Sequence, residues 1–153
     1  MCLLTILISC DNKQQSYRLR NSIIDKCSKQ ADCKINMTEL TWFEWDKLFV
    51  FDESATYPLI KRELGFEFPK YKEFSRFIIF TLDDEIVYFE EEPYNPSQRK
   101  NNSVWFSLPI RESFMYFDKQ SAIFEVEINI IDEKTYYTLH PIKQTVNFTY
   151  KPK

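Results

Sequence analysis

The sequence predicts a single α+β domain built mostly of antiparallel strands. The chain has 153 residues, of which 44% are hydrophobic and 17% aromatic, and a chain of this length can bury about two thirds of its unfolded surface in one core. Apolar residues alternate with period two over much of residues 33–150, whereas helical spacing is confined to two short segments. We therefore expect about seven strands, one helix packed against them and a looser helix near the N-terminus.

The first element is an uncharged apolar run, residues 3–8, that ends in Leu7-Ile8-Ser9-Cys10 and is followed at once by Asp11. An aliphatic residue and a small residue before Cys is the pattern of a bacterial lipobox, in which the leader is cut before a cysteine whose thiol carries a diacylglycerol. Secretory leaders begin with positive charges, which this run lacks, so we expect the natural start to lie upstream. The alternative is that residues 1–10 form a buried first strand of a cytosolic domain.

Acylation of Cys10 would determine where the protein works. Each methylene that leaves water contributes roughly 0.8 kcal/mol, so one acyl chain binds a membrane marginally and a second makes the attachment durable. The apolar run is far shorter than the about 20 residues that a spanning helix needs. We expect a partial signal peptide at 1–9, a lipidated tether with a helix at 10–31 and an α+β domain at 32–153. Lipid anchoring would hold the domain on the exported face of the cell membrane or outer membrane.

Residues 12–31 are polar, with sparse apolar positions whose spacing is partly helical. These positions are Tyr17, Ile23, Ile24 and Cys27. They predict a weakly amphipathic helix that holds the domain off the membrane. If Cys2 leaves with the leader and Cys10 is acylated, Cys27 and Cys33 remain, and an even pair in an exported protein favours a disulfide. The pair can bond only if its Cα atoms lie within about 7 Å, which the sequence leaves open.

From Cys33 the period changes to two. Cys33, Ile35 and Met37 alternate with polar residues, which predicts a strand. Residues 45–51 form a second predicted strand that is apolar on both faces near its end.

A helix is predicted after this strand. Thr56 can cap it, Pro58 lies in its first turn, and Gly65, the only glycine in the chain, suits the left-handed position just past its end. The residues expected to face the core are Leu59, Ile60 and Leu64.

The remainder of the chain is typical of antiparallel sheet. Residues 77–82 and 86–89 flank an acidic turn and predict a hairpin whose strands are apolar on both faces, so we expect both to lie centrally. Residues 93–102 form the most loop-like stretch, and residues 104–106 resume the sheet. Further strands are expected at 124–130, 136–142 and 146–150, with a turn at 132–134.

One segment resembles a known group of proteins. It runs from Leu40 to Phe51, with the sequence LTWFEWDKLFVF, and is followed by the capped helix and the aliphatic hairpin. It resembles a family of small, uncharacterised bacterial lipoproteins that share a Phe-x-Trp-Asp-Lys strand motif shortly after a lipobox. Where that family has a Pro-Tyr-Thr helix start, this chain has residues 52–57, DESATY. The resemblance covers about residues 10–89, implies an exported and membrane-anchored protein, and brings no enzymatic activity with it.

Composition and motifs argue against several functions. Twenty basic and 23 acidic residues give a net charge of −3 without a basic cluster, which argues against nucleic-acid binding. Cys27 and Cys33, with no second pair or nearby His, do not make a zinc site. A chain with one glycine has no phosphate-cradling loop. We therefore expect no metal and no cofactor.

Catalytic residues are also not expected. Glu44 and Asp46 point to one face of a predicted strand, which is the minimum for glycosidic chemistry by paired carboxylates. We favour instead a structural role in which Asp46 accepts backbone hydrogen bonds and Trp45 fills the core. His140, the only histidine, is interpreted as the end of an exposed edge strand. The chain is thus not expected to be an enzyme.

The stretch Glu90-Glu91-Glu92 before Pro93 is a local acidic feature. We interpret it as a solvated strand end, because successive Glu side chains point to alternate faces and ligate a cation poorly. Together with Tyr94 in the following loop, it is also our candidate surface for an envelope protein partner. We expect a lipid-anchored binding or structural module of the cell envelope that offers an aromatic sheet face and the loop at 93–102 to a partner protein. The alternative is an inhibitor or immunity-type lipoprotein that blocks a toxin or cell-wall hydrolase through these acidic positions.

Overall fold

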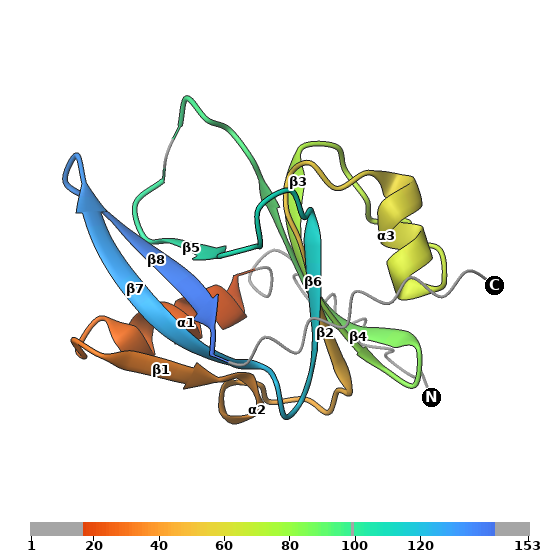
Figure 1. The fold of residues 1–153 in the computed structure, drawn as a ribbon, viewed down its shortest axis with the longest axis horizontal. Helices are drawn as coiled ribbons and strands as arrows, with labels where there is room; N and C mark the ends of the chain where they lie inside the picture. Colours follow the sequence, from red (N-terminus) through yellow and green to blue (C-terminus); the bar gives the residue numbers. More distant parts are fainter. Residues whose placement is uncertain (1–16, 99, 143–153) are drawn as a thin grey trace, which may run out of the picture.

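Eight strands and three helices occupy residues 17–98 and 100–142, which are the residues that the computed structural model describes (Figure 1). In chain order they are α1 (Arg18–Cys27), β1 (Cys33–Asn36), α2 (Met37–Leu40), β2 (Lys47–Phe51), α3 (Tyr57–Leu64), β3 (Ser75–Leu82), β4 (Glu85–Pro93), β5 (Ser103–Phe106), β6 (Phe114–Asp118), β7 (Ile123–Ile131) and β8 (Lys134–Pro141). Cys10 and the strand predicted at 146–150 lie outside the described residues.

The strands form two four-stranded sheets, with the orders β1-β7-β8-β5 and β4-β3-β2-β6. Every neighbouring pair is antiparallel except β5 and β8, which run parallel. The predicted fold class, one α+β domain of mostly antiparallel sheet, is therefore confirmed, although the described residues alone hold eight strands instead of about seven.

The predicted hairpin is present as β3 and β4. Its turn residues Asp83 and Asp84 both have left-handed backbones, with φ of 51° and 62°, as a tight two-residue hairpin turn requires. β3 lies centrally, as predicted. The central position predicted for β4 is wrong, because β4 is an edge strand.

Two apolar cores lie on opposite faces of the β4-β3-β2-β6 sheet. The first core fills the space between the two sheets and contains Leu48, Phe80, Phe124 and Leu139, each with no accessible surface. The second core lies under α3, where Ile60 and Leu64 of the helix pack against aromatic side chains of β2 and β3. In Figure 1 the β1-β7-β8-β5 sheet, the β4-β3-β2-β6 sheet and α3 follow one another from left to right.

Helix α3 forms as predicted. Thr56 precedes it with an extended backbone but makes no side-chain capping hydrogen bond, and Pro58 lies in the first turn. Gly65 ends the helix with φ of 83°, a conformation that glycine adopts without steric cost. Ile60 and Leu64 are buried, and Leu59 packs against the same core.

Helix α1 is part of the first core. Leu19, Ile23 and Cys27 have no accessible surface, and α1 contacts both β1 and β5, the two edge strands of one sheet. The expectation that this helix is looser than the rest is therefore wrong, and the folded domain extends back to residue 18. Leu19, Ile23 and Cys27 recur every four positions and form an apolar stripe, beside which Ile24 packs against the same core and Arg20 is also buried.

A disulfide joins Cys27 at the end of α1 to Cys33 at the start of β1. The two Cα atoms are 5.3 Å apart and the sulfur atoms 2.06 Å apart. Both cysteines are at most 1% exposed. The bond therefore fastens α1 to the first sheet from inside the core.

Replacing both cysteines with Ala is expected to lower the free energy of unfolding by about 2 kcal/mol, because the cross-link restricts a short loop of the unfolded chain. Urea denaturation of the oxidised wild type and of Cys27→Ala/Cys33→Ala would measure the loss. A wild type whose urea midpoint equals that of the variant, with and without reductant, would show that the bond contributes nothing.

No helix within 17–98 and 100–142 is both long enough and apolar enough to cross a membrane.

Candidate functional site

The acidic stretch on β4 divides between the two faces of its sheet. Glu90 and Glu92 pair in register with Ile78 and Arg76 of β3, and Ile78 belongs to the first core. Because side chains alternate along a strand, Glu90 and Glu92 face the space between the sheets. Glu91 faces the other way.

The interpretation of this stretch as a solvated strand end is wrong. Glu90 has no accessible surface, and the side chains of Glu91 and Glu92 are only 15% and 13% exposed. Glu91 is bound by Lys72 Nζ at 2.7 Å and by Ser75 Oγ at 3.0 Å. Glu90 therefore cannot belong to an exposed partner surface, whereas Tyr94 is 37% exposed.

Arg20, Tyr88, Glu90 and Glu92 form a buried charge cluster between α1 and β4. Arg20 Nη1 lies 3.2 Å from Glu90 Oε2, and Arg20 Nη2 lies 3.7 Å from Glu92 Oε2. The Tyr88 hydroxyl donates to Glu90 Oε1 at 2.6 Å, and the backbone N–H of Leu19 donates to the same oxygen at 2.7 Å. Glu90 thus satisfies an amide of the first turn of α1, which the helix itself leaves without a partner.

The cluster is not fully satisfied. Arg20 Nε and Nη1 and the Oε2 atoms of Glu90 and Glu92 are buried without a hydrogen bond of good geometry in the described part of the chain. Burial raises the pKa of Glu90 above its usual value, against the opposing effects of Arg20, Tyr88 and the Leu19 amide. Burial and the neighbouring Glu90 raise the pKa of Tyr88 as well.

Glu90 makes the stability of the fold depend on pH. Because its pKa is higher in the folded state than the usual 4.5, the folded state binds this proton more tightly. The protonation of Glu90 therefore stabilises the folded state fully below about pH 4.5, and this stabilisation is lost as the pH rises through the pKa of Glu90 in the folded state. We expect Glu90→Gln to remove this loss, so that the free energy of unfolding of the wild type, relative to the variant, falls with rising pH.

Urea unfolding of both proteins between about pH 4 and pH 8 would measure this difference. A difference that stays constant over that range would contradict the assignment to Glu90.

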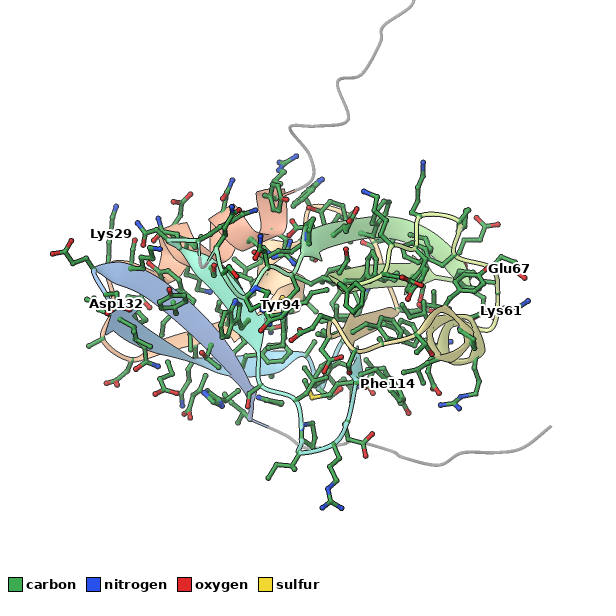
Figure 2. All side chains as sticks on the ribbon, turned by 90° about the horizontal axis from the view of Figure 1, so that it is seen from above. Lys29, Lys61, Glu67, Tyr94, Phe114 and Asp132 are labelled. Carbon is green, nitrogen blue, oxygen red and sulfur yellow. A yellow bond between two sulfur atoms is a disulfide. The ribbon has the colours of Figure 1, made fainter. Side chains whose placement is uncertain are left out.

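Beside the buried charge cluster lies a cleft of about 350 Å³. We call it the inter-sheet cleft and define it by six of its lining residues: Glu53, Arg76, Glu92, Tyr94, Lys100 and Trp105. The segment between β4 and β5 crosses from one sheet to the other (Figure 1), and it supplies Tyr94 and Lys100. In Figure 2, seen from above, Tyr94 lies near the middle of the molecule, between the hairpin tip at Asp132 and the α3 side at Lys61.

Arg76 is held rigidly in this cleft. Its Nε donates to Glu53 Oε2 at 2.6 Å, and its guanidinium carbon lies 4.7 Å from the ring centroid of Tyr94 and 4.6 Å from that of Trp105. Both distances suit cation–π attraction. Although partial burial alone would raise the pKa of Glu53, the hydrogen bond and charge of Arg76 hold it below its usual value. Glu53 is therefore ionised at neutral pH.

The cleft also has groups without a partner. Within the described ranges, Nε is the one nitrogen of the Arg76 guanidinium that has a hydrogen-bonded partner, and the two Nη atoms have none. Lys100, which lines the same cleft, has no ion pair there. Two further cavities, of about 190 and 520 Å³, share Arg76 and Lys100 respectively with the cleft and both reach Arg20. The cleft and the buried charge cluster are thus adjacent parts of one polar region.

The Trp-Asp-Lys segment before β2 has structural contacts. Trp45 is 1% exposed, and its Nε1 donates to Thr41 Oγ1 at 2.9 Å. Asp46 accepts from Thr81 Oγ1 at 3.2 Å and from the Asp83 amide at 3.3 Å. Glu44 instead accepts from Lys119 Nζ, at 3.1 Å, so the two carboxylates have separate partners.

The interpretation of His140 as the end of an edge strand is wrong. His140 lies near the end of β8, which runs between β7 and β5, and its Nε2 is 3.0 Å from Glu127 Oε2. Across 17–98 and 100–142, no group of three or more His, Cys, Asp or Glu side chains could hold a metal ion.

Sequence reasoning found Glu92 and Tyr94 of the cleft, included Lys100 only as part of the loop at 93–102, and missed Glu53, Arg76 and Trp105. Arg76 had one local signal, since it is a charged residue at the start of a long apolar strand. The alternating Tyr88, Glu90 and Glu92 also indicated a polar stripe on one face of β4. Glu53, Lys100 and Trp105 come from separate segments, and their meeting depends on the packing of the two sheets.

No protein-family model matches the chain, and no similar protein was found among curated proteins or among solved structures.

Proposed function

We propose that this protein is a lipid-anchored binding module of the bacterial cell envelope, which presents the inter-sheet cleft to a partner outside the cytoplasm. The observation that carries the anchor is Leu7-Ile8-Ser9-Cys10 followed by a polar turn. The Cys27–Cys33 disulfide supports an exported location, because disulfides persist mainly in oxidising compartments. The resemblance to small bacterial lipoproteins is in line with this proposal.

The inter-sheet cleft supports the binding role. Its volume falls within the about 300–1,000 Å³ that is usual for ligand sites. Arg76 lies against the rings of Tyr94 and Trp105, and arginine and aromatic residues are the types most enriched at binding hot spots. The alternative function, an inhibitor, depended on the acidic stretch Glu90-Glu91-Glu92. These side chains pair with Arg20 and Lys72 within the domain, so the proposed binding role does not require them to be exposed.

Photo-cross-linking in the native bacterium would test this role. A photoreactive residue at Gln98, which lines the cleft, is expected to form a specific adduct, whereas the same residue at the exposed Lys29 is not. Trp105→Ala should abolish the adduct, and Ile130→Ala, at a 74% exposed site on β7, should leave it unchanged. Equal adducts from Gln98 in the wild type and in Trp105→Ala would contradict the proposal.

A further inference from the structure

The orientation of Arg76 indicates what the inter-sheet cleft recognises. Glu53 binds its Nε, and its guanidinium carbon lies over the rings of both Tyr94 and Trp105. This leaves the two Nη groups as the part of the side chain without a hydrogen-bonded partner in the described residues. A fixed, planar pair of N–H donors matches the two oxygens of a carboxylate.

Lys100 provides a second cation on the same cleft. It is exposed, lines the cleft beside Arg76 and has no ion pair within residues 17–98 and 100–142. Glu53 already pairs with Arg76, so Lys100 is the cation of the cleft that a bound anion would meet without an ion-pair partner. The two cations, Arg76 and Lys100, and the two carboxylates, Glu53 and Glu92, balance in the cleft lining, which suits a ligand that brings an N–H donor together with its negative charge.

Glu92 limits the ligand further. It pairs with Arg76 across β3 and β4, so its carboxylate lies beside the guanidinium on the same face. Its Oε2 is buried without a hydrogen bond, with Arg20 Nη2 3.7 Å away, while the side chain as a whole is 13% exposed and lines the cleft. A ligand group with an N–H donor next to its carboxylate would satisfy Glu92, whereas a phosphate dianion would be repelled by Glu53 and Glu92.

The walls of the cleft suit an apolar substituent. Tyr94 and Trp105 line it together with Pro93 and Pro96, and these side chains offer flat, rigid apolar surface. A volume of about 350 Å³ accommodates a ligand of one or two amino-acid residues.

From these observations we propose that the inter-sheet cleft binds the α-carboxylate of a peptide C-terminus or of a free amino acid, with Arg76 and Lys100 on the carboxylate, Glu92 accepting from the adjacent N–H, and the last side chain against Trp105. This inference rests on the proposed binding role of the cleft. It adds the chemical class of the ligand.

Calorimetric titration of the purified full chain would test it. The probes are dipeptides with N-terminal Ala and C-terminal Ala, Leu, Phe or Lys, their C-terminal amides, the ester analogues that lack the last N–H, the free amino acids, and inorganic phosphate. At least one dipeptide is expected to bind with a dissociation constant below about 1 mM. Its amide and its ester analogue should each bind about 10- to 100-fold more weakly.

Variants connect binding to the named residues. Arg76→Lys keeps the charge but removes the planar pair of donors, and should weaken binding about 10- to 100-fold. Lys100→Ala, at an exposed position that does not affect folding, should weaken it about three- to tenfold. Lys29→Ala is the matched control and should leave binding unchanged. Equal affinities for Lys100→Ala and wild type would overturn the role of Lys100 even if Arg76→Lys failed to fold.

The outcomes separate the two proposals. Preference for a dipeptide over its free C-terminal amino acid supports a peptide end, and equal binding supports a free amino acid. Tighter binding of phosphate, or no binding by any dipeptide or amino acid, overturns this inference. If the Gln98 adduct still forms and still requires Trp105, the binding role stands and only the ligand class is wrong.

Discussion

Arg20→Met is expected to lower the free energy of unfolding by about 3–5 kcal/mol, because it leaves buried carboxylates without their cation. Arg20 is 5% exposed and lies 3.2 Å from Glu90 and 3.7 Å from Glu92. Glu90 has no accessible surface and cannot recover its lost partner from water. Urea unfolding at neutral pH would measure the loss.

Arg18→Met is the matched control. Arg18 is an exposed residue of the same helix whose guanidinium carbon lies 3.8 Å from the Trp42 ring, and its replacement should cost no more than about 1 kcal/mol. Adding Glu90→Gln and Glu92→Gln to Arg20→Met should restore part of the loss, since the buried charges are then gone. An Arg20→Met protein with the wild-type urea midpoint would contradict the buried charge cluster.

Ile23→Ala is expected to destabilise the domain by about 2–5 kcal/mol, the range for removing a fully buried aliphatic side chain. Ile23 has no accessible surface and packs in the first core. A tether that only spaces the domain from a membrane would tolerate this change. Asn21→Ala, at an exposed position of the same helix, should change stability by less than about 0.5 kcal/mol.

Thermal and urea unfolding of the two variants would therefore distinguish a core helix from a spacer. Equal midpoints for Ile23→Ala and Asn21→Ala would show that α1 does not contribute to the folded domain.

Elements whose signals are local could be predicted from the sequence. The β3–β4 hairpin has its turn chemistry in Asp83 and Asp84, and α3 has Pro58 at one end and Gly65 at the other. In β7, apolar and charged residues alternate because one face meets the core and the other meets water. These patterns do not depend on distant parts of the chain.

Strand β6 was missed for a physical reason. Met115 and Phe117 face the first core, whereas Phe114 and Tyr116 pack against the second. Such a short apolar run, only residues 114–117, cannot be distinguished from a buried helical turn by periodicity alone. The parallel pairing of β5 with β8 was missed because register between distant strands leaves no local signal.

The candidate site was even less predictable from the sequence, because it depends on contacts between distant residues. Arg20 meets Glu90 across 70 positions of sequence, and Arg76 meets Trp105 only because β3 and β5 approach from different sheets. The polarity of Glu90 predicted exposure, but a cation from α1 allows it to be buried. Charged residues that pair in the interior cannot be distinguished from surface residues by composition.

The central claim is that acyl chains on Cys10 attach this domain to a membrane outside the cytoplasm. Intact mass spectrometry of the protein extracted from its native membrane tests the claim most directly. The account predicts a mature chain that begins at Cys10 and carries the mass of a diacylglycerol, with or without a further acyl chain. A chain that retains residues 1–9 and an unmodified Cys10 would contradict it.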